Sequence, residues 1–393
     1  MEGPAQVSTA PETPVLDLLY SDVEDDLRTQ VRALLADHCP PAALLAAVES
    51  EDLHDTALWQ ALARELGVAG LSVPEELGGA GASWNETALV LEELGRAAAP
   101  VPYLGSSVLA TAALLAVGDT RLLPEVAAGR RIACLAVPFA SWPGGVFPDT
   151  IRTGPGTVTG TVSGVADALA ADVLLVPSTG PDGPALHAVD LSGTGSTVTR
   201  QAVTSLDLTR PLADIVLRSA PALPLAQGAD AERALRQALV AGAALLSSEQ
   251  LGVAEWCLAT TVAYTKERHQ FARPIGSFQA VQHRLADLWV LVTLARAVAR
   301  NAAAALSANT ATVATEAALA QAFVSDAAVK VAEEALQLHG GIGFTWEHPV
   351  HLYLKRAKST ALALGTADRH RFALGGLAGL PGAVPHADGA TPS

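Results

Sequence analysis

Hydrophobic residues in the first third of the chain recur at the spacing of amphipathic helices. The first set comprises Leu27, Val31, Leu34 and Leu35. Residues three or four positions apart share one face of an α-helix, so this spacing predicts a helix that packs against a core. Pro40 and Pro41 follow directly. They are expected to end the helix, because proline lacks the N–H that a further helical turn requires.

The same spacing returns in two later segments. Trp59, Leu62 and Leu66 form a second helical face, and Gly67 follows as a helix stop. A turn-rich segment comes next, and then a third helix is expected over residues 83–96. That helix begins with a serine, which is a typical N-cap residue. The pattern therefore predicts a helical region that extends to about residue 117.

The middle of the chain has a different pattern. Between about residues 132 and 217, Thr, Val, Gly and Pro become frequent. Short apolar runs such as 173–176 and 215–217 are separated by glycine and proline. Short runs that are divided by turn residues are typical of β-strands, so this region is expected to be a β-domain.

Long helices return in the last third of the chain. Residues 230–266 contain no proline, a second helix is expected after Pro274 and Gly276, a third near Thr312, and a fourth that includes residues 353–358. Long helices with short connections predict an antiparallel bundle.

The expected fold class is therefore a multidomain α+β protein with an N-terminal helical domain, a middle β-domain and a C-terminal four-helix bundle. Polar, proline-rich ends are expected to be disordered. The expected boundaries are a disordered tail over 1–15, the helical domain over 16–125, the β-domain over 126–222, the bundle over 223–378 and a second disordered tail over 379–393.

Composition and charge exclude several classes of partner. The net charge is −15, so the chain has no electrostatic reason to bind nucleic acid or an anionic membrane. No uncharged apolar run approaches the roughly 20 residues of a spanning helix, and the first residues lack the pattern of a signal peptide. Cys39, Cys134 and Cys257 are far apart and show no metal or disulfide spacing. We therefore expect a cytoplasmic protein without a metal site.

Two runs near the C-terminal end carry candidate chemistry. Residues 268–283 read RHQFARPIGSFQAVQH, and residues 337–345 read QLHGGIGFT. The planar guanidinium of Arg268 can hold a diphosphate through two parallel charged hydrogen bonds. The pair Gly340–Gly341 lets a backbone approach a ligand closely and exposes its N–H groups. Each feature also has a structural interpretation, as a helix-terminal surface arginine and as a helix C-cap followed by a turn.

These runs resemble the acyl-CoA dehydrogenase family. LGVAGLSVPE at 66–75, Gly78–Gly79 and LEELGR at 91–96 add support, and the resemblance extends from about residue 20 to residue 375. It is to the actinobacterial branch that handles steroid side chains and other bulky acyl groups, often as two different subunits in one tetramer. The family's order of domains is the one expected above.

The resemblance implies an FAD-dependent enzyme that oxidises acyl-CoA or another acyl thioester at its α and β carbons, with an electron-transfer flavoprotein as acceptor. In the family, the arginine that matches Arg268 reaches the FAD of a neighbouring subunit. The cofactor contacts that the resemblance assigns to this chain are Arg268, Gln270, Phe271, Phe278, Gln279, Gln337, Gly340, Gly341 and Thr366.

Other family positions are altered. Ala136 stands where the family has a threonine that contacts the flavin ring, and Gly164 where it has a tryptophan that shields the ring. One branch places its catalytic glutamate at the position of Leu364, and another at the position of Gly242. Neither residue can accept a proton, so the catalytic residue of this chain is unknown. Asp368 also replaces a neutral glutamine near the diphosphate.

The chain thus keeps the contacts that face a neighbour and loses those around its own flavin ring. Glu232 and Glu249 lie about two helical turns or more from Gly242, too far to replace the base directly. We interpret the chain as an FAD-dependent acyl-CoA dehydrogenase that acts in a homo- or heterotetramer whose partner supplies the base. Two alternatives stay open, namely a non-catalytic structural subunit of such a complex and an enzyme that runs another reaction on the same fold.

Two further pairs of polar residues are expected to be structural. Glu92 and Glu93 are adjacent on a predicted helix, and we expect them to face solvent because adjacent helical positions point in different directions. His348 and His351 flank a proline. They resemble a solvated helix start more than a pair of metal ligands.

Overall fold

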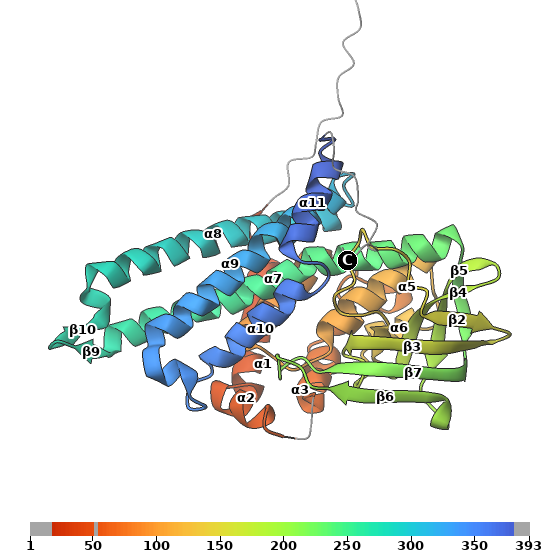
Figure 1. Cartoon of the computed structure of the whole chain (residues 1–393), viewed down its shortest axis with the longest axis horizontal. Helices are drawn as coiled ribbons and strands as arrows, with labels where there is room; N and C mark the ends of the chain where they lie inside the picture. Colours follow the sequence, from red (N-terminus) through yellow and green to blue (C-terminus); the bar gives the residue numbers. More distant parts are fainter. Residues whose placement is uncertain (1–17, 51–53, 381–393) are drawn as a thin grey trace, which may run out of the picture.

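Helices and strands occupy separate regions of the molecule (Figure 1). The computed structural model describes residues 18–50 and 54–380, so the tail expected over 1–15 and most of the tail expected over 379–393 lie outside them. The sheet lies on the right in Figure 1 and the long helices on the left, with the N-terminal helices beside both. This arrangement confirms the predicted fold class.

The N-terminal region is helical, as the spacing of apolar residues predicts. Its helices are α1 (Asp22–His38), α2 (Pro41–Ala47), α3 (Thr56–Gln60), α4 (Trp84–Ala97), α5 (Thr111–Val117) and α6 (Leu123–Ala127), with π-helical turns η1 (Ala61–Glu65) and η4 (Leu104–Ala110) and 3-10 turns η2 (Val68–Gly70) and η3 (Glu75–Leu77). Ser83 caps α4 and forms a capping box with Glu86. Gly67 has φ 72° after η1, the left-handed conformation that ends helices.

The expectation for Glu92 and Glu93 is wrong, because both side chains are buried. Arg32 of α1 binds Glu93 with two hydrogen bonds of 2.9 and 2.6 Å. Arg28 lies 2.9 Å from a carboxylate oxygen of Glu92, and the Tyr20 hydroxyl donates to the other at 2.7 Å. The two carboxylates therefore fasten α1 to α4, and a helical pattern read from α4 alone cannot reveal these partners.

The β-domain is one eight-stranded sheet with the order β6-β7-β3-β2-β4-β5-β8, in which β1 pairs with β4. The strands are β1 (Ala133–Leu135), β2 (Ile151–Gly154), β3 (Thr157–Ala166), β4 (Val173–Gly180), β5 (Gly183–Asp190), β6 (Val198–Val203), β7 (Leu212–Pro221) and β8 (Leu223–Gln227), and a 3-10 turn, η5 (Gly195–Thr197), precedes β6. Pairing is antiparallel except for β1 and β2 against β4. One face of the sheet joins the apolar core of the helices, and a second cluster of apolar residues fills the other face.

The C-terminal region forms a bundle around one long helix. Its elements are α7 (Ala229–Glu267), α8 (Gln279–Ser307), α9 (Val313–His339), α10 (Val350–Leu362) and α11 (Ala367–Leu377), with β9 (His269–Gln270), β10 (Arg273–Pro274), η6 (Ile275–Ser277) and η7 (Gly340–Phe344) at their connections. In Figure 1, α7 runs from the sheet to the far tip of the bundle, where β9 and β10 lie. α11 is an element that the sequence pattern did not predict.

α8 passes a simple test for a membrane-spanning helix. It has 29 residues, and its most apolar window has a mean hydropathy of 1.3. About 44% of that window is buried within this chain, where α8 packs on α7 and α9. Length and composition alone therefore do not distinguish it from a core helix of a bundle.

Candidate functional site

The residues expected to contact a cofactor fall in two places, and most lie at the tip of the bundle. α7 ends at Glu267, Arg268 follows, and the β9–β10 hairpin turns back through Phe271 and Ala272, whose φ angles are 53° and 61°. Phe271 at this turn is 88% exposed. α8 then begins at Gln279. The hairpin therefore presents Arg268, Gln270, Phe271, Phe278 and Gln279 around one small projection.

The guanidinium of Arg268 has no hydrogen bond or ion pair within residues 18–50 and 54–380. Its side chain is exposed, so its charge is available to an anion or to another subunit. The structure is thus compatible both with a diphosphate-binding residue and with a surface arginine at a helix end.

The glycine pair lies at the same end of the bundle. α9 ends at His339, and Gly340 follows with φ 62°, which confirms the predicted helix end. The His339 ring stacks on Tyr264 of α7 with ring centroids 4.6 Å apart, and the Arg268 N–H donates to the Tyr264 carbonyl at 2.9 Å. The end of α9 is therefore tied to the end of α7. We call this region, residues 268–279 and 337–341, the bundle end.

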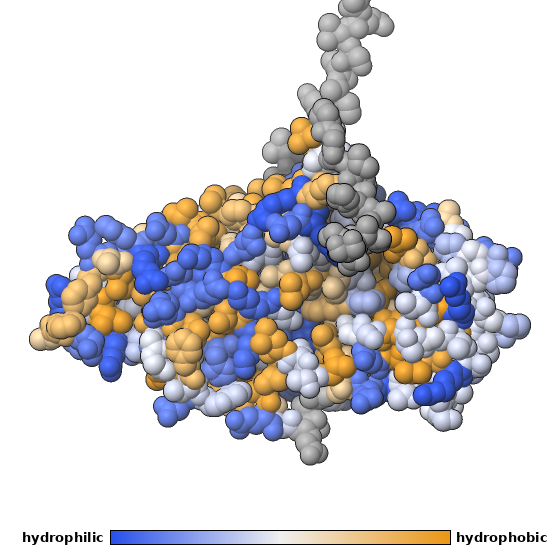
Figure 2. Space-filling model, in the orientation of Figure 1, coloured by the Kyte–Doolittle hydropathy of each residue, from blue (hydrophilic) through white to orange (hydrophobic). Residues whose placement is uncertain are grey.

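The bundle end is open. A Cβ atom placed on Gly340 or Gly341 would meet nothing within 4 Å, so both backbone positions are accessible to a ligand or to another chain. Gln337 is exposed beside them. In Figure 2, hydrophobic and hydrophilic residues lie side by side at this left-hand tip.

The two positions expected for a catalytic base converge elsewhere, although they are far apart in sequence. A Cβ atom on Gly242 of α7 would lie 3.0 Å from the Leu364 Cδ1 atom and would overlap Leu109 Cδ2. Leu364 is fully buried and Leu109 is 5% exposed. The place for a carboxylate is therefore filled by two leucine side chains, in agreement with the absence of a base at both positions.

Phe139 closes the space in front of Leu364. Its N–H donates to the Gly164 carbonyl at 2.9 Å, and its own carbonyl accepts from the Leu364 N–H at 2.8 Å. One residue thus joins β3 directly to the position of the missing base. The Phe139 backbone therefore lies between Gly164 and Leu364 and is hydrogen-bonded to both. We call the set Leu109, Phe139, Gly242 and Leu364 the junction.

Sequence reasoning missed Leu109 and Phe139. Neither belongs to a motif, and only the packing of η4 and of the segment after β1 brings them to this place. The residues at positions 136 and 164 are a partial signal that the flavin contacts are altered. Ala136, which is buried within the sheet region, has only a methyl group, and Gly164, which has φ 66°, has no side chain. Neither can therefore donate to a flavin ring or stack on it.

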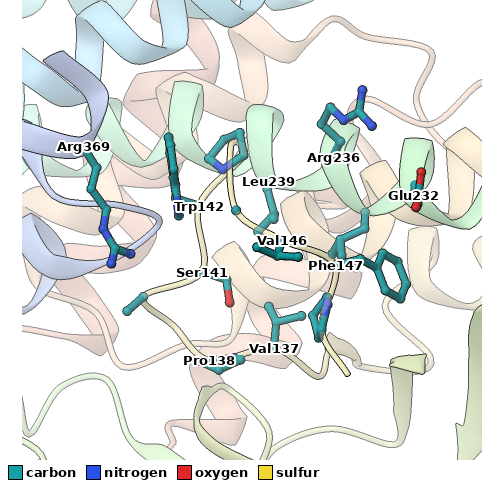
Figure 3. Close-up of a pocket in the computed structure, with 15 residues that line it drawn as sticks. Val137, Pro138, Ser141, Trp142, Val146, Phe147, Glu232, Arg236, Leu239 and Arg369 are labelled. Carbon is teal, nitrogen blue, oxygen red and sulfur yellow. The ribbon is translucent and has the colours of Figure 1, made fainter. Parts of the chain in front are cut away.

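Trp142 lies next to the junction, between two cavities. The first has a volume of about 460 Å³ and is bordered by Trp142, by Arg236 and Leu239 of α7 and by Arg369 of α11. In Figure 3 the loop that carries Trp142 crosses this cavity, and the Arg236 guanidinium points away from the loop. The second, of about 340 Å³, also borders Trp142. A Cβ atom on Gly365 would lie 2.8 Å from the Trp142 Cβ atom, so this loop is packed tightly on the start of α11.

Thr366 is separate from the other expected cofactor contacts. It caps α11, where its side chain accepts from the Arg369 N–H, and it lies beside the junction in the chain. Asp368 in the first turn of α11 is exposed and pairs with Arg371 at 2.8 Å. The structure therefore brings the expected cofactor contacts of the bundle end together and leaves Thr366 apart from them.

Glu249 cannot replace the missing base. It is buried, Arg210 binds it with hydrogen bonds of 3.0 and 2.6 Å, and Arg356 donates to it at 2.8 Å. Burial alone would raise the pKa of Glu249, but the two guanidinium groups lower it to about 2. A carboxylate held in this way is a poor proton acceptor near neutral pH. Glu232 is exposed at the edge of the first cavity.

The expectation for the histidines near the start of α10 is also wrong in part. His348 is half-buried, and its ring lies 4.4 Å from the His339 ring. Burial and the neighbouring His339 and His351 lower the pKa of His348 to about 4. His348 therefore belongs to the packing of the bundle end rather than to a solvated helix start. Within residues 18–50 and 54–380, no group of three or more His, Cys, Asp or Glu side chains is placed to hold a metal ion.

Comparison with known proteins agrees with this architecture. Two family models match, "Acyl-CoA dehydrogenase, N-terminal domain" at residues 21–130 and "Acyl-CoA dehydrogenase, C-terminal domain" at residues 232–375. The chain is 41% identical over 345 residues to acyl-CoA dehydrogenase IpdE2 of Mycolicibacterium smegmatis, with 88% of this chain and 95% of that protein covered. It is 40% identical over 344 residues to IpdE2 of Mycobacterium tuberculosis, with 86% and 92% covered.

Solved structures show the same fold. A chain of the ChsE4–ChsE5 complex from Mycobacterium tuberculosis superposes with a TM-score of 0.82 at 31% identity and covers 93% of this chain and 100% of that chain. Butyryl-CoA dehydrogenase from Megasphaera elsdenii gives a TM-score of 0.83 at 22% identity, with 92% and 100% covered, which shows a shared fold. Both family models and these relatives span the helical regions on either side of the sheet, and the chain belongs to the acyl-CoA dehydrogenase family.

Proposed function

We propose that this chain is a subunit of an FAD-dependent acyl-CoA dehydrogenase complex and that it completes a cofactor site on a partner subunit. In this proposal the substrate is acyl-CoA or another acyl thioester, the partner supplies the base, and the complex is a tetramer that passes electrons to an electron-transfer flavoprotein. When bound, FAD supplies the acceptor for the hydride that leaves the β-carbon.

The observation that carries the proposal is the backbone bridge through Phe139. It joins Gly164 to Leu364 at 2.9 and 2.8 Å, and neither Gly164 nor Ala136 has a side chain that can stack on a flavin ring or donate to one. Leu109 and Leu364 also occupy the place of a carboxylate. The residues at the junction therefore do not fit the cofactor, and no step of the reaction is assigned to them.

The bundle end fits part of the cofactor. An exposed guanidinium with no partner in the described residues and two adjacent glycines with open surroundings are the groups that hold a phosphate-bearing dinucleotide. Arg268, Gln270 and Gln279 from the hairpin and Gln337 from α9 would provide the polar contacts. Their task in the proposal is to bind and orient the cofactor, and the proton transfer takes place on the partner.

A mixed assembly is supported by the relatives. ChsE4–ChsE5 is a complex of two chains, one of which superposes on this chain over nearly its whole length. The closed junction also supports a second candidate function, that of a purely structural subunit. The two proposals differ in whether the bundle end touches FAD, which flavin analysis can decide.

The test is a flavin-to-chain ratio. The chain is produced alone in a heterologous host, and a tagged copy is purified from its native host together with the chains it binds. Absorbance of released FAD is divided by the amount of each chain. We expect no FAD on the chain alone and one FAD for every two chains in the complex. A yellow preparation of the chain alone that oxidises acyl-CoA with an artificial electron acceptor would contradict the proposal.

A further inference from the structure

The bundle end is held together by a set of stacked rings that the proposed function leaves unexplained. We propose that His339 is a positioning residue, which fixes the end of α9 against the end of α7 so that the glycine pair and Arg268 lie at the spacing that a dinucleotide requires. This inference rests on the proposed function. It adds a specific role for a residue that has no contact with the reacting atoms.

The first face of His339 is tied to α7. The His339 ring is 2% exposed and stacks on Tyr264 at a centroid distance of 4.6 Å and an interplanar angle of 25°. Because the Tyr264 carbonyl accepts from the Arg268 N–H at 2.9 Å, any shift of Tyr264 also moves the backbone of Arg268. The position of Arg268 therefore depends on the ring of a residue 71 positions later in the chain.

The other side of His339 is tied to α10. The His348 ring lies 4.4 Å away at 43°, and His348 in turn lies against Trp256 at 6.4 Å. Trp256 stacks on Tyr353 of α10 at 3.5 Å, with the two ring planes 1° apart. These five rings, Tyr264, His339, His348, Trp256 and Tyr353, extend across the bundle, and we call them the ring stack.

The stack continues into the N-terminal region. The Tyr353 hydroxyl donates to the Arg96 carbonyl at 2.8 Å. The ring stack therefore connects the bundle end to the N-terminal helices. Its flat aromatic side chains are more rigid than flexible aliphatic ones. His339 is the member directly beside Gly340, which has a positive φ of 62°.

Hydrogen bonding sets the orientation of the ring. The His339 Nδ1 atom lies 2.7 Å from the Ala335 carbonyl, so it carries the proton and donates. Nε2 is buried without a hydrogen-bond partner among the described residues. His339→Phe therefore removes one hydrogen bond, to a carbonyl of the same helix, and keeps the flat ring that contacts Tyr264 and His348.

The experiment compares two substitutions of similar bulk in the purified complex. His339→Phe keeps a flat ring, and His339→Leu keeps an apolar side chain without the plane. The dissociation constant for FAD is measured by equilibrium dialysis of the flavin-free complex, and Tm is measured on the same samples. We expect His339→Leu to raise the Kd for FAD by about tenfold and His339→Phe to change it by less than about threefold.

A matched control is His187→Leu. His187 is also buried, in β5 of the sheet, far from the bundle end in the chain. It should lower Tm and leave the Kd for FAD unchanged. Equal Kd values for His339→Leu and His339→Phe would overturn the inference, because the ring plane would then have no role in positioning.

Arg268→Ala separates the two proposals. If it raises the Kd for FAD and His339→Leu does not, the positioning role fails and the proposed function stands. If Arg268→Ala leaves the Kd unchanged, the bundle end does not hold FAD, and both proposals are overturned.

Discussion

The bundle end and the junction have opposite properties. At the bundle end, Arg268, Gln337 and the glycine pair are accessible, and Arg268 has no charge partner among the described residues. At the junction, Leu109 and Leu364 are buried and the Phe139 backbone bonds to both sides of the gap. A surface that keeps its uncompensated charge is available for binding, whereas a gap filled by apolar side chains has become part of the core.

Under the proposed function, this difference means that the chain keeps the half of a shared site that faces a neighbour and lacks the half around its own flavin ring. The half that faces a neighbour is built from a hairpin, a helix end and a turn, and it needs few supporting contacts. The half that would hold a ring in the chain itself needs an empty volume. An empty apolar volume is unfavourable because its lining loses packing contacts, so the leucine side chains that fill the junction stabilise the fold.

The largest expected effect comes from breaking the ion cluster near the junction. Glu249→Ala leaves the buried Arg210 without its carboxylate partner, while Arg356 keeps Asp207 at 2.7 Å, and an uncompensated buried charge costs about 3–5 kcal/mol of unfolding free energy. The measurement is urea-induced unfolding of the chain. Glu232→Ala on the same helix is the control, and because Glu232 is exposed, it should change stability by less than about 0.5 kcal/mol. A cost below about 1 kcal/mol for Glu249→Ala would show that the cluster does not hold α10 and the β6–β7 connection to α7.

Restoring a carboxylate at the junction tests whether the site is closed. Leu364→Glu should lower stability by about 1–3 kcal/mol, because the new group is buried among Leu109 and other apolar neighbours without a partner. The chain alone should gain no dehydrogenase activity, which is measured with acyl-CoA and an artificial electron acceptor. Leu364→Gln is the control of equal shape. Activity in Leu364→Glu alone would mean that the Phe139 bridge opens and admits the cofactor.

At the bundle end, the expected effect is on binding rather than on stability. Arg268→Ala should weaken FAD binding by the complex by about 10- to 100-fold, the range for losing hydrogen bonds to a charged group. Tm should be unchanged, because the side chain is exposed and unpaired in the described part of the chain. Arg268→Lys keeps the charge but lacks the planar guanidinium. Its affinity for FAD should therefore lie between that of the unchanged complex and that of Arg268→Ala.

The control for Arg268 is Arg233→Ala, at the opposite end of α7, where Arg233 pairs with exposed Asp230. Unchanged flavin content in Arg268→Ala would favour the interpretation of Arg268 as a surface residue at a helix end.

The smallest expected effect is on the pH dependence of the free energy of unfolding. The pKa of His348 is lowered to about 4 in the folded protein, whereas an unfolded histidine titrates near 6.5. Between these values the unfolded state binds more protons, so stability falls as the pH drops from about 6.5 to about 4 and is constant above that window. His348→Phe should reduce this loss, by less than about 1.4 kcal/mol per pH unit. The comparison is urea unfolding at about pH 5 and about pH 7.5.

Glu92 provides a control of opposite sign. Burial, with the charge of Glu255, raises the pKa of Glu92 to about 7, so the folded state binds more protons between about 4.5 and 7, and its contribution to stability is lost as pH rises. Glu92→Gln should therefore make the free energy of unfolding fall more steeply as the pH drops, whereas His348→Phe makes that fall shallower. Equal slopes in the two variants would contradict the assignment of both groups.

Features formed by neighbouring residues could be predicted from the sequence. Ser83 and Glu86 form the capping box, Gly67 and Gly340 take the positive φ that ends helices, and the long helix without proline extends over α7. The hairpin that carries Arg268 also lies in one continuous run, but the pairing of β9 with β10 was not predicted. Such features depend on hydrogen bonds and backbone preferences within a few residues, so the local sequence is sufficient to specify them.

The sequence by itself determined that both expected positions for a base are aliphatic, since Gly242 and Leu364 are read directly. Only the tertiary structure decided that these positions meet, that Leu109 and Phe139 fill the space, and that Arg28 and Arg32 bury Glu92 and Glu93. Each of these contacts joins segments tens to hundreds of residues apart, and its free energy comes from packing and charge pairing between whole elements. No pattern within one segment carries that information.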